Sequence, residues 1–304
     1  MDNLIGKTRI KRERLVLTLL AVPFIIFVFA FSYVPLFGWI LAFIKYKPGL
    51  NIFQCDFAGL EYFWLIFQDW RIFSVIKNTL AMSFLGLLCA PLPAVFAIFL
   101  SELKSVRFKK IVQTITTIPN FVSWVIIYAL SYALFSSEGV VNQVLMNLGW
   151  VSKATNILGN TKAVWGFQTA LGVWKSIGWN AIIYFAAIAG IDSELYDAAS
   201  VDGAGRFRKI LHITIPGISS TFFVLLLLQI SNILSSGIDQ YLAFYNSMVA
   251  DKITVLDLYV YRLGLVTQDY SYATAVGISK TVISIVLLFG ANGLSKKLRG
   301  EGLV

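Results

Sequence analysis

Long apolar runs separated by short charged segments dominate the pattern of the chain. Six such runs lie at residues 15–44, 78–100, 111–135, 163–191, 218–236 and 272–294. A helix rises about 1.5 Å per residue, so about 20 residues cross a hydrocarbon core of about 30 Å, and each run is long enough to do so. The pattern therefore predicts an all-α membrane protein with six transmembrane helices.

Prolines lie within or at the edges of several runs, at Pro23, Pro35, Pro91, Pro93 and Pro119. A proline lacks the amide hydrogen that a helix interior needs, but membrane helices tolerate the break where neighbouring helices satisfy the freed carbonyls. We therefore expect the second helix to kink at Pro91 and Pro93.

The composition supports lipid as the solvent. Of the 304 residues, 58% are hydrophobic and 13% are charged, whereas an average soluble domain is about 45–50% apolar and about 25% charged. The first run is far longer than the apolar part of a signal peptide, about 7–15 residues, so we interpret it as a retained membrane helix. The expected parts are an N-terminal tail at 1–14, a six-helix membrane domain at 15–294 and a C-terminal tail at 295–304.

Basic residues are concentrated in one of the two alternating sets of segments between the runs. The N-terminus, the segments after the second and fourth runs and the C-terminus hold Lys7, Arg9, Lys11, Arg12, Arg14, Lys104, Arg107, Lys109, Lys110, Arg206, Arg208, Lys209, Lys296, Lys297 and Arg299. Because positively charged segments stay in the cytoplasm, both termini are predicted to be cytoplasmic. This placement explains the net charge of +9, and no nucleic-acid partner is expected.

The sequence contains no arrangement of residues typical of an enzyme. His212 is the only histidine, and neither it nor the two cysteines, Cys55 and Cys89, has metal-ligand spacing. Gly6-Lys7-Thr8 matches the end of a phosphate-binding loop, but Met1 occupies the position where that loop needs a further glycine. We expect no catalytic residue, no metal ligand and no cofactor bound by this chain.

The segment after the fourth run, IDSELYDAASVDGAGRFRKILHITIPGI at 191–218, has the pattern of two short helices. Asp192 or Ser193 is a suitable cap for the first helix, which has one apolar face. Gly203 and Gly205 interrupt that helix, and Pro216 is expected to close a second one before the fifth membrane helix begins. By pattern alone, the pair either rests on anionic lipid or docks a cytoplasmic protein.

This segment resembles the coupling motif of binding-protein-dependent ABC importers, which reads E-A-A, three residues, G, nine residues, I, any residue, L-P. The matching residues, with the motif's spacing, are Asp197, Ala198, Ala199, Gly203, Ile213, Ile215 and Pro216. Asp197 replaces the usual Glu and Ile215 the usual Leu, each keeping the chemical type. The resemblance implies that the residues coupling to an ATPase are Asp197, Ala198, Ala199, Asp202, Gly203, Ala204, Arg206, Phe207, Ile213 and Pro216.

From about Pro35 onward, the chain resembles the importer permeases for oligosaccharides and polysaccharide fragments, a branch related to the maltose and alginate permeases. The stretches that carry the likeness include VPLFGWILAFIKYKPG, FKKIVQTITTIPNFVSW, VWKSIGWNAIIYFAAIAGID and YSYATAVG. The implied fold is that of a type I ABC importer permease, with a cytoplasmic coupling helix pair between helices 4 and 5. The implied activity is oligosaccharide import by alternating access in the cytoplasmic membrane of a prokaryote.

The same resemblance implies several partners. They are a second permease subunit that is a different chain, two cytoplasmic ATPase subunits that bind ATP and Mg, and an extracellular solute-binding protein that delivers the sugar. The maltose-importing members place sugar contacts on the helices either side of the coupling loop. Polar and aromatic residues in the corresponding runs are therefore the candidates for the substrate pathway: Trp174, Lys175, Trp179, Asn180, Gln229, Asn232 and Ser236.

Spacing and polarity leave alternatives open for these residues. Gln229, Asn232 and Ser236 are expected on one helix face, where they either line the pathway or bond to a neighbouring helix. Ionisable groups within membrane spans are candidates for function, but Lys175 and Lys280 are also able to extend to the interface.

Two further groups of residues, expected outside the membrane helices, each have two possible roles. Residues 239–241 face either the sugar or an external partner. Aromatic residues between Tyr46 and Phe73 either anchor the chain at the interface or contact that partner.

The main rival is a secondary transporter that couples a small polar solute to an ion gradient. Such transporters usually contain internal repeats, and no clear repeat occurs in this sequence. The segment at 192–216 would have no purpose in such a protein.

Overall fold

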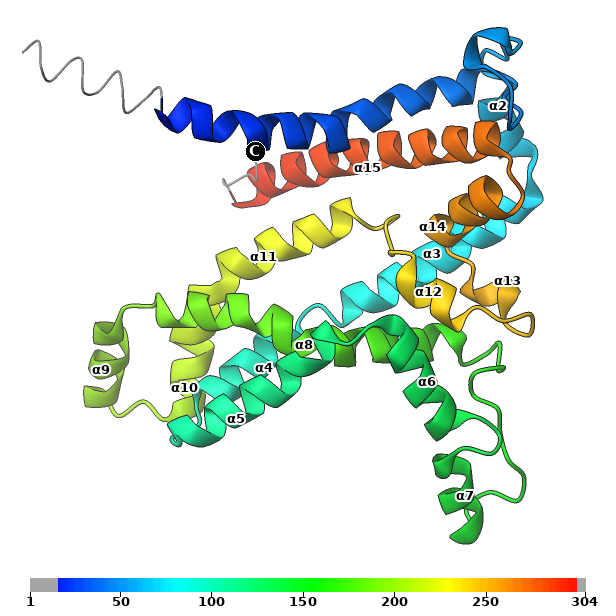
Figure 1. Ribbon diagram of the computed structural model, residues 1–304. Coiled ribbons are helices and arrows are strands. Elements are labelled where there is room, and N and C mark those ends of the chain that lie inside the picture. The colour runs from blue at the N-terminus through cyan, green and yellow to red at the C-terminus, as the bar shows by residue number, and fades with distance from the viewer. Residues whose placement is uncertain (1–15, 300–304) are drawn as a thin grey trace, which may run out of the picture. The chain divides into compact units, whose positions relative to one another are not determined.

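The computed structural model describes residues 16–299, which are helical apart from connecting segments and one isolated antiparallel bridge between Ile44 and Phe57 (Figure 1). These residues form two compact units, each described by itself. Unit 1 contains residues up to Gln68 and Arg262–Ser279, and unit 2 contains Asp69–Tyr261 and the residues from Lys280 onward. The predicted tail at 1–14, with Gly6-Lys7-Thr8, and residues 300–304 lie outside the described residues, so the expected tail boundaries stay a prediction.

Unit 1 begins with a long helical stretch. Residues 16–28 are α-helical and are followed by η1 (Phe29–Tyr33), η2 (Val34–Phe43), η3 (Ile52–Gln54) and α2 (Glu61–Gln68). Later in the chain, η6 (Arg262–Val266) and the first turns of α15 (Tyr270–Arg299) complete the unit. The Ser271 hydroxyl donates to the Ile44 carbonyl at 2.7 Å and accepts from the Tyr46 amide at 3.1 Å, which closes the end of the first long stretch.

Unit 2 holds most of the chain. Its elements are α3 (Trp70–Leu88), α4 (Leu92–Ser101), α5 (Val106–Thr117), η4 (Ile118–Phe121), α6 (Trp124–Phe135), α7 (Val140–Asn147), α8 (Val164–Ala189), α9 (Ser193–Val201), α10 (Arg206–Lys209), η5 (Ile210–Thr214), α11 (Ile215–Ser231), α12 (Asp239–Phe244), α13 (Ala250–Ile253) and α14 (Leu256–Tyr261), with the rest of α15. Helices α4 and α5 pack along α8, and α9 lies beyond the end of α8 (Figure 1).

Six stretches of the described residues are long and apolar enough to cross a membrane, as the sequence predicts. They are Val16–Phe43, Trp70–Ser101, Trp124–Asn147, Val164–Ala189, Arg206–Ser231 and Tyr270–Lys297. The break expected at Pro91 and Pro93 is present, because α3 ends at Leu88 and α4 begins at Leu92.

The third predicted span, 111–135, is wrong as a single helix. Helix α5 ends at Thr117, a 3-10 turn covers Pro119, and the chain is extended at Val122 and Ser123. The Ser123 hydroxyl then accepts from the Ile126 amide at 3.4 Å and caps α6. A proline followed by a serine helix cap therefore interrupts the apolar run.

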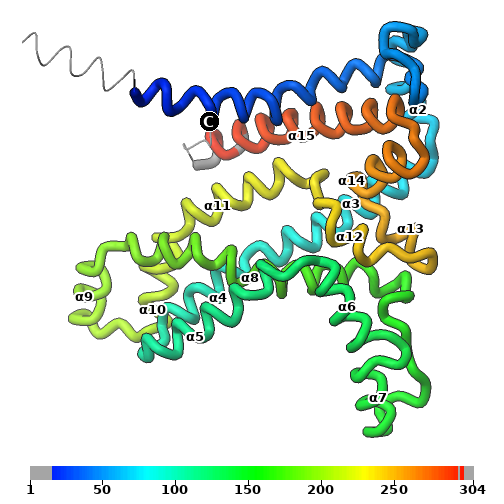
Figure 2. Tube along the Cα trace, in the orientation of Figure 1, coloured from blue at the N-terminus to red at the C-terminus, as the bar shows by residue number. Residues whose placement is uncertain are grey.

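The fifth predicted span and the second short helix before it also need correction. Helical backbone runs from Arg206 through α10, η5 and α11 to Ser231, so Pro216 does not close a separate unit (Figure 2). Pro216 cannot donate a helix hydrogen bond. The π-turn of η5 precedes it, and the Ile215 amide donates to the Ile210 carbonyl five residues back. The wider turn accommodates the proline without ending the helix.

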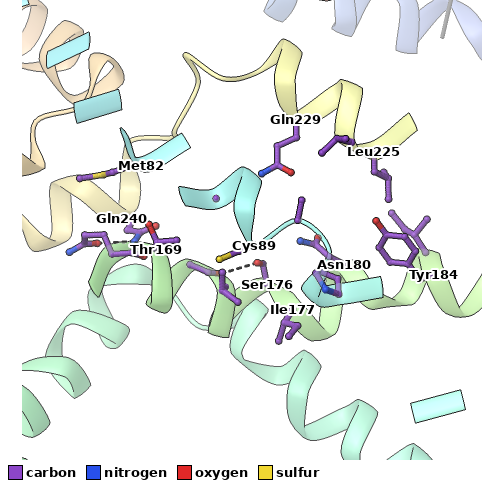
Figure 3. A pocket seen from close by; sticks show the side chains of 18 of the residues that line it. Met82, Cys89, Thr169, Ser176, Ile177, Asn180, Tyr184, Leu225, Gln229 and Gln240 are labelled. Carbon is purple, nitrogen blue, oxygen red and sulfur yellow. Dashed lines mark hydrogen bonds between the residues drawn. The ribbon is translucent and has the colours of Figure 1, made fainter. Parts of the chain in front are cut away.

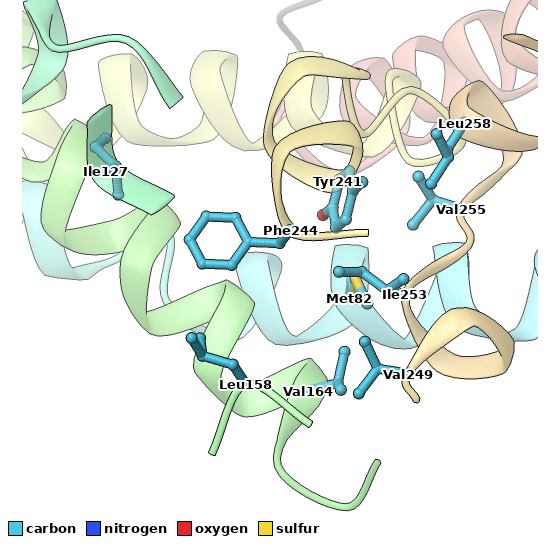
Figure 4. Close-up of a cluster of buried hydrophobic side chains, with 10 residues drawn as sticks. All are labelled: Met82, Ile127, Leu158, Val164, Tyr241, Phe244, Val249, Ile253, Val255 and Leu258. Atoms are coloured by element: carbon cyan, nitrogen blue, oxygen red, sulfur yellow. The ribbon is translucent and has the colours of Figure 1, made fainter. Parts of the chain in front are cut away.

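Two buried clusters hold unit 2 together. One joins α3, α6, α8 and the α12–α14 region through Met82, Ile127, Leu158, Val164, Tyr241, Phe244, Val249, Ile253, Val255 and Leu258 (Figure 4). The second joins α4, α8 and α11 through Ala94, Ala97, Ile98, Ala181, Tyr184 and Ile218. The alanines of the second cluster let the helices approach closely, as small residues do between membrane helices.

Helix α8 also approaches the end of α5 very closely. A Cβ atom added at Gly178 would lie 2.2 Å from the Thr116 carbonyl oxygen, so only glycine fits there without a shift. This contact brings the turn of α8 that precedes Gly178 against the break between α5 and α6.

Candidate functional site

A cavity of about 520 Å³ lies between α8, α11 and the α3–α4 break. The side chains of Gln168, Thr169, Ser176, Asn180, Gln229 and Gln240 supply its polar groups, and Trp124, Tyr184 and Tyr241 supply aromatic rings. Gln229 points from α11 towards Cys89, and Ser176 and Asn180 project from α8 (Figure 3). Amides, hydroxyls and ring faces in one concave space are the groups that bind a polyhydroxylated ligand with apolar ring faces.

A second, smaller cavity of about 260 Å³ shares part of this wall. Met82, Gly86, Gln229 and Tyr241 line both spaces. The further polar lining of the smaller cavity comes from Ser83, Asn232, Ser235 and Ser236. The residues between α11 and α12 therefore face a continuation of the main cavity.

The side of the cavity next to α12 is fixed by amide hydrogen bonds. The Gln240 side-chain amide donates to the Gln168 carbonyl and to the Gln168 side-chain oxygen, each at 2.8 Å. Beside it, burial raises the pKa of Tyr241 to about 12. Tyr241 therefore remains a neutral hydroxyl at physiological pH.

Lys175 does not line either cavity. Its ammonium donates to the carbonyl oxygens of Pro119 at 3.0 Å, Asn120 at 2.7 Å and Val122 at 2.6 Å, and lies 5.4 Å from the centre of the Trp124 ring. These carbonyls belong to the break between α5 and α6, where only the Pro119 carbonyl also accepts a backbone hydrogen bond, from the Val122 amide at 3.2 Å, among the contacts of the described residues. The charge expected on the substrate pathway instead stabilises an irregular segment of backbone.

The other predicted pathway residues divide into two groups. Asn180 and Gln229 line the main cavity, and Gln229, Asn232 and Ser236 meet around the smaller one. Trp174 and Trp179 line neither cavity, and Trp179 packs edge-on against Phe121.

One prediction about this site is wrong, and two cavity residues were not predicted. The shared helix face predicted for Gln229, Asn232 and Ser236 is wrong, because α11 ends at Ser231 and Ser236 lies in the following loop. Gln168 and Ser176 were missed, although Gln168, Gly172, Ser176 and Asn180 recur every four residues in α8 and all line the cavity. This spacing predicts a polar stripe on one helix face.

The segment at 192–216 contains α9 and the first turns of the long helix. Of the two predicted caps, Asp192 is the one that caps α9, and its side chain accepts from the Glu194 amide at 2.9 Å. Gly203 follows with a φ of 72°, a left-handed conformation that favours glycine. The hydroxyls of Tyr196 and Thr214 lie 2.9 Å apart and join α9 to η5.

Most of the predicted coupling residues are accessible in the chain. Asp197, Ala198, Asp202, Gly203, Arg206, Phe207 and Pro216 are exposed, and Ala199, Ala204 and Ile213 are half-buried. Val201 and Phe207 are 89% and 84% exposed. Large apolar side chains so exposed beside a polar turn are typical of a surface that a protein or lipid covers.

A family model described as the binding-protein-dependent transport system inner membrane component matches residues 83–300. The chain belongs to this family. It is 37% identical to Protein LplB of Bacillus subtilis (strain 168) over 97% of this chain and 92% of that protein. It is also 37% identical to the polygalacturonan/rhamnogalacturonan transport system permease protein YteP of the same organism, over 96% and 94% of the two chains.

A solved structure supports the same family fold. The chain matches, with a TM-score of 0.86 and 34% identity, a chain of a bacterial alginate ABC transporter in complex with an alginate pentasaccharide-bound periplasmic protein. The match covers 97% of this chain and 99% of that one. The family is one of membrane transport proteins, and the described helices have its permease fold.

Proposed function

We propose that this chain is a permease subunit of an ATP-driven importer that moves an oligosaccharide across the cytoplasmic membrane of a prokaryote. The observation that carries the proposal is the connection of a cavity to the coupling segment by one helix. Gln229 lines the cavity near one end of the helix that starts at Arg206, next to Gly203. A displacement of the segment at 192–216 therefore moves the cavity wall.

The coupling segment is proposed to face the cytoplasm, where each of two ATPase subunits binds one such segment and supplies ATP and Mg. The basic residues at both ends of the chain and beside α5 and α10 favour this orientation, with both termini cytoplasmic. A second permease chain is proposed to complete the pathway.

The proposed substrate is an oligosaccharide delivered by an extracellular solute-binding protein. The relative YteP is named for polygalacturonan and rhamnogalacturonan transport, and the matched structure contains an alginate pentasaccharide on its periplasmic protein. Amide and aromatic groups of the cavity suit the hydroxyls and ring faces that all such sugars present.

The test begins with purification of the tagged chain from its own host's membranes. We expect an ATPase, a second permease and a solute-binding protein to co-purify, and the reconstituted complex to accumulate a labelled oligosaccharide from a panel only when ATP is supplied inside the vesicles. Uptake that follows an imposed ion gradient without ATP would replace the proposal with a secondary transporter.

A further inference from the structure

A partly buried ion pair lies close to the cavities without lining either of them. The Lys280 ammonium of α15 pairs with the Asp257 carboxylate of α14, and the two side chains are 18% and 19% exposed. Neither residue is among those that line the larger or the smaller cavity. Removing two charges from water is costly, so a pair in a membrane protein calls for a role that a pair of apolar residues would not fill.

The second oxygen of Asp257 indicates that role. It accepts a hydrogen bond from the Gly237 amide at 3.0 Å. Gly237 has a φ of 76°, which few other residues adopt, and nothing lies within 4 Å of a Cβ added there. The backbone at Gly237 is therefore shaped to present its amide to the carboxylate.

Gly237 ends the loop that forms part of the smaller cavity. The loop leaves α11 at Asn232, and the Ser83 hydroxyl donates to its Ile233 carbonyl at 2.6 Å. Ser235 and Ser236 follow, and both line the smaller cavity. One hydrogen bond thus holds the loop at its start and another at its end, with the cavity-lining serines between them.

We propose that Asp257 and Lys280 form a positioning pair that holds the loop at 232–237 against the sugar pathway. The Asp257 carboxylate fixes the Gly237 amide, and Lys280 supplies the positive charge that pairs with this carboxylate and orients it. The pair acts on the sugar only through the loop. This inference rests on the proposed function.

Paired substitutions separate the hydrogen bond from the charges. D257N/K280M removes both charges, and its amide oxygen still accepts from Gly237. D257A/K280M removes both charges and the acceptor as well. K280M alone leaves the carboxylate without its counter-charge, which is expected to be worse than the neutral D257N/K280M pair.

The main measurement does not need sugar. In the assembled complex with Cys55 and Cys89 replaced by alanine, S236C reports the loop through its rate of thiol labelling. We expect D257A/K280M to label at least fivefold faster than D257N/K280M, which should label within twofold of the parent. Equal rates in the two double variants would overturn the role of the Gly237 hydrogen bond.

Uptake supplies the second readout. We expect D257A/K280M to raise the half-saturation concentration of the sugar at least threefold, with a maximal rate within twofold of D257N/K280M. A fall in maximal rate alone, or a K280M variant that assembles, labels and transports like the parent, would also overturn the proposal. Failure of the parent complex to transport any oligosaccharide would refute the proposed function, while the labelling rates would still decide the role of the pair.

Discussion

The ammonium of Lys175 lies 2.6 Å from the carbonyl oxygen of Val122, and this contact joins residues 53 positions apart. Two further carbonyls, those of Pro119 and Asn120, share the same charge. Non-helical backbone at membrane depth needs such partners because lipid offers none. The contact explains how the chain keeps a break between α5 and α6 inside an apolar run.

Replacing Lys175 with Met should therefore destabilise the permease. The substitution leaves three carbonyls without their charged donor, and one such hydrogen bond contributes about 1.5–3 kcal/mol. We expect K175M to lower the melting temperature of the purified complex by several degrees, and K175R to lower it less because its guanidinium still donates. If the K175M complex were as stable as the wild type but bound sugar more weakly, the result would support a role for Lys175 in the substrate pathway and contradict its structural role.

The close approach at Gly178 should tolerate no side chain. G178A places a Cβ atom 2.2 Å from the Thr116 carbonyl oxygen, whereas nothing lies within 4 Å of a Cβ at Gly166 in the same helix. We expect G178A to reduce the yield of assembled complex and its melting temperature, and the matched G166A to leave both unchanged or slightly raised. Equal behaviour of the two variants would show that α5 and α8 separate easily.

Substitutions at Gly203 should act through the backbone conformation that they disfavour and not through the size of the new side chain. Its φ is 72° and nothing lies within 4 Å of an added Cβ, while Gly205 is equally open and has an ordinary φ of −69°. A non-glycine residue in the left-handed region costs about 1–2 kcal/mol. We expect G203V to uncouple ATP hydrolysis from uptake, G203N to do so less, and G205A to remain coupled.

Both activities would be measured on the same reconstituted complex. Full coupling in G203V would count against the role of the 192–216 segment.

Gln229 should contribute to sugar affinity and not to assembly. It points into the main cavity from α11, so Q229L removes a hydrogen-bonding amide with little change in volume. We expect the half-saturation concentration for uptake to rise about tenfold, the effect of losing roughly 1.4 kcal/mol of binding. Ser220 lies on the same helix, is exposed and lines neither cavity, so S220A is the control. Unchanged affinity in Q229L would remove Gln229 from the site.

Asp69, which caps the N-terminus of α3, should make the stability of the protein depend on pH. Burial opposes the charged form, but hydrogen bonds from Tyr259, at 2.6 Å, and from Arg71 outweigh it and hold the pKa of this carboxyl below its ordinary value. The folded form therefore binds the proton less tightly than the unfolded form. The stabilisation is present above about pH 4 and is lost as the pH falls through the folded pKa.

D69N should remove this dependence. We expect the melting temperature of the wild type to fall more steeply than that of D69N between about pH 6 and pH 3.5. Parallel curves would show that other carboxylates determine the acid response.

The sequence predicts the membrane fold well, because apolar runs of sufficient length have few alternatives. It also predicts the Asp192 cap and the break after α3, where residue types act on their own neighbours. The break in the third run has local signals in Pro119 and Ser123, but the charge that satisfies the broken backbone comes from Lys175, far away along the chain. The partners of buried charges, such as Asp257 for Lys280, are likewise set by tertiary packing and have no local signal.

Only part of the candidate site could be predicted, because its residues are also brought together by tertiary packing. Asn180 and Gln229 stand out as polar residues in apolar surroundings, and both line the cavity. Trp174 and Lys175 stand out equally, yet the helical repeat of α8 turns them away from the stripe that begins at Gln168. Residue type identifies unusual positions. Which side of the helix faces the cavity depends on how the helix is rotated about its axis when it packs against its neighbours.

The unbroken backbone from Arg206 to Ser231 limits how the protein is able to work. About 35 Å along the helical backbone separates Arg206 from Gln229, and the helix continues through Pro216 by way of the π-turn of η5. Under the proposed coupling, a displacement of the helix near Arg206 would reach Gln229 through the backbone of one helix. The size of that displacement depends on how stiffly the π-turn of η5 joins α10 to α11, so substitutions that stiffen or loosen this turn should change how much ATP is hydrolysed for each sugar moved.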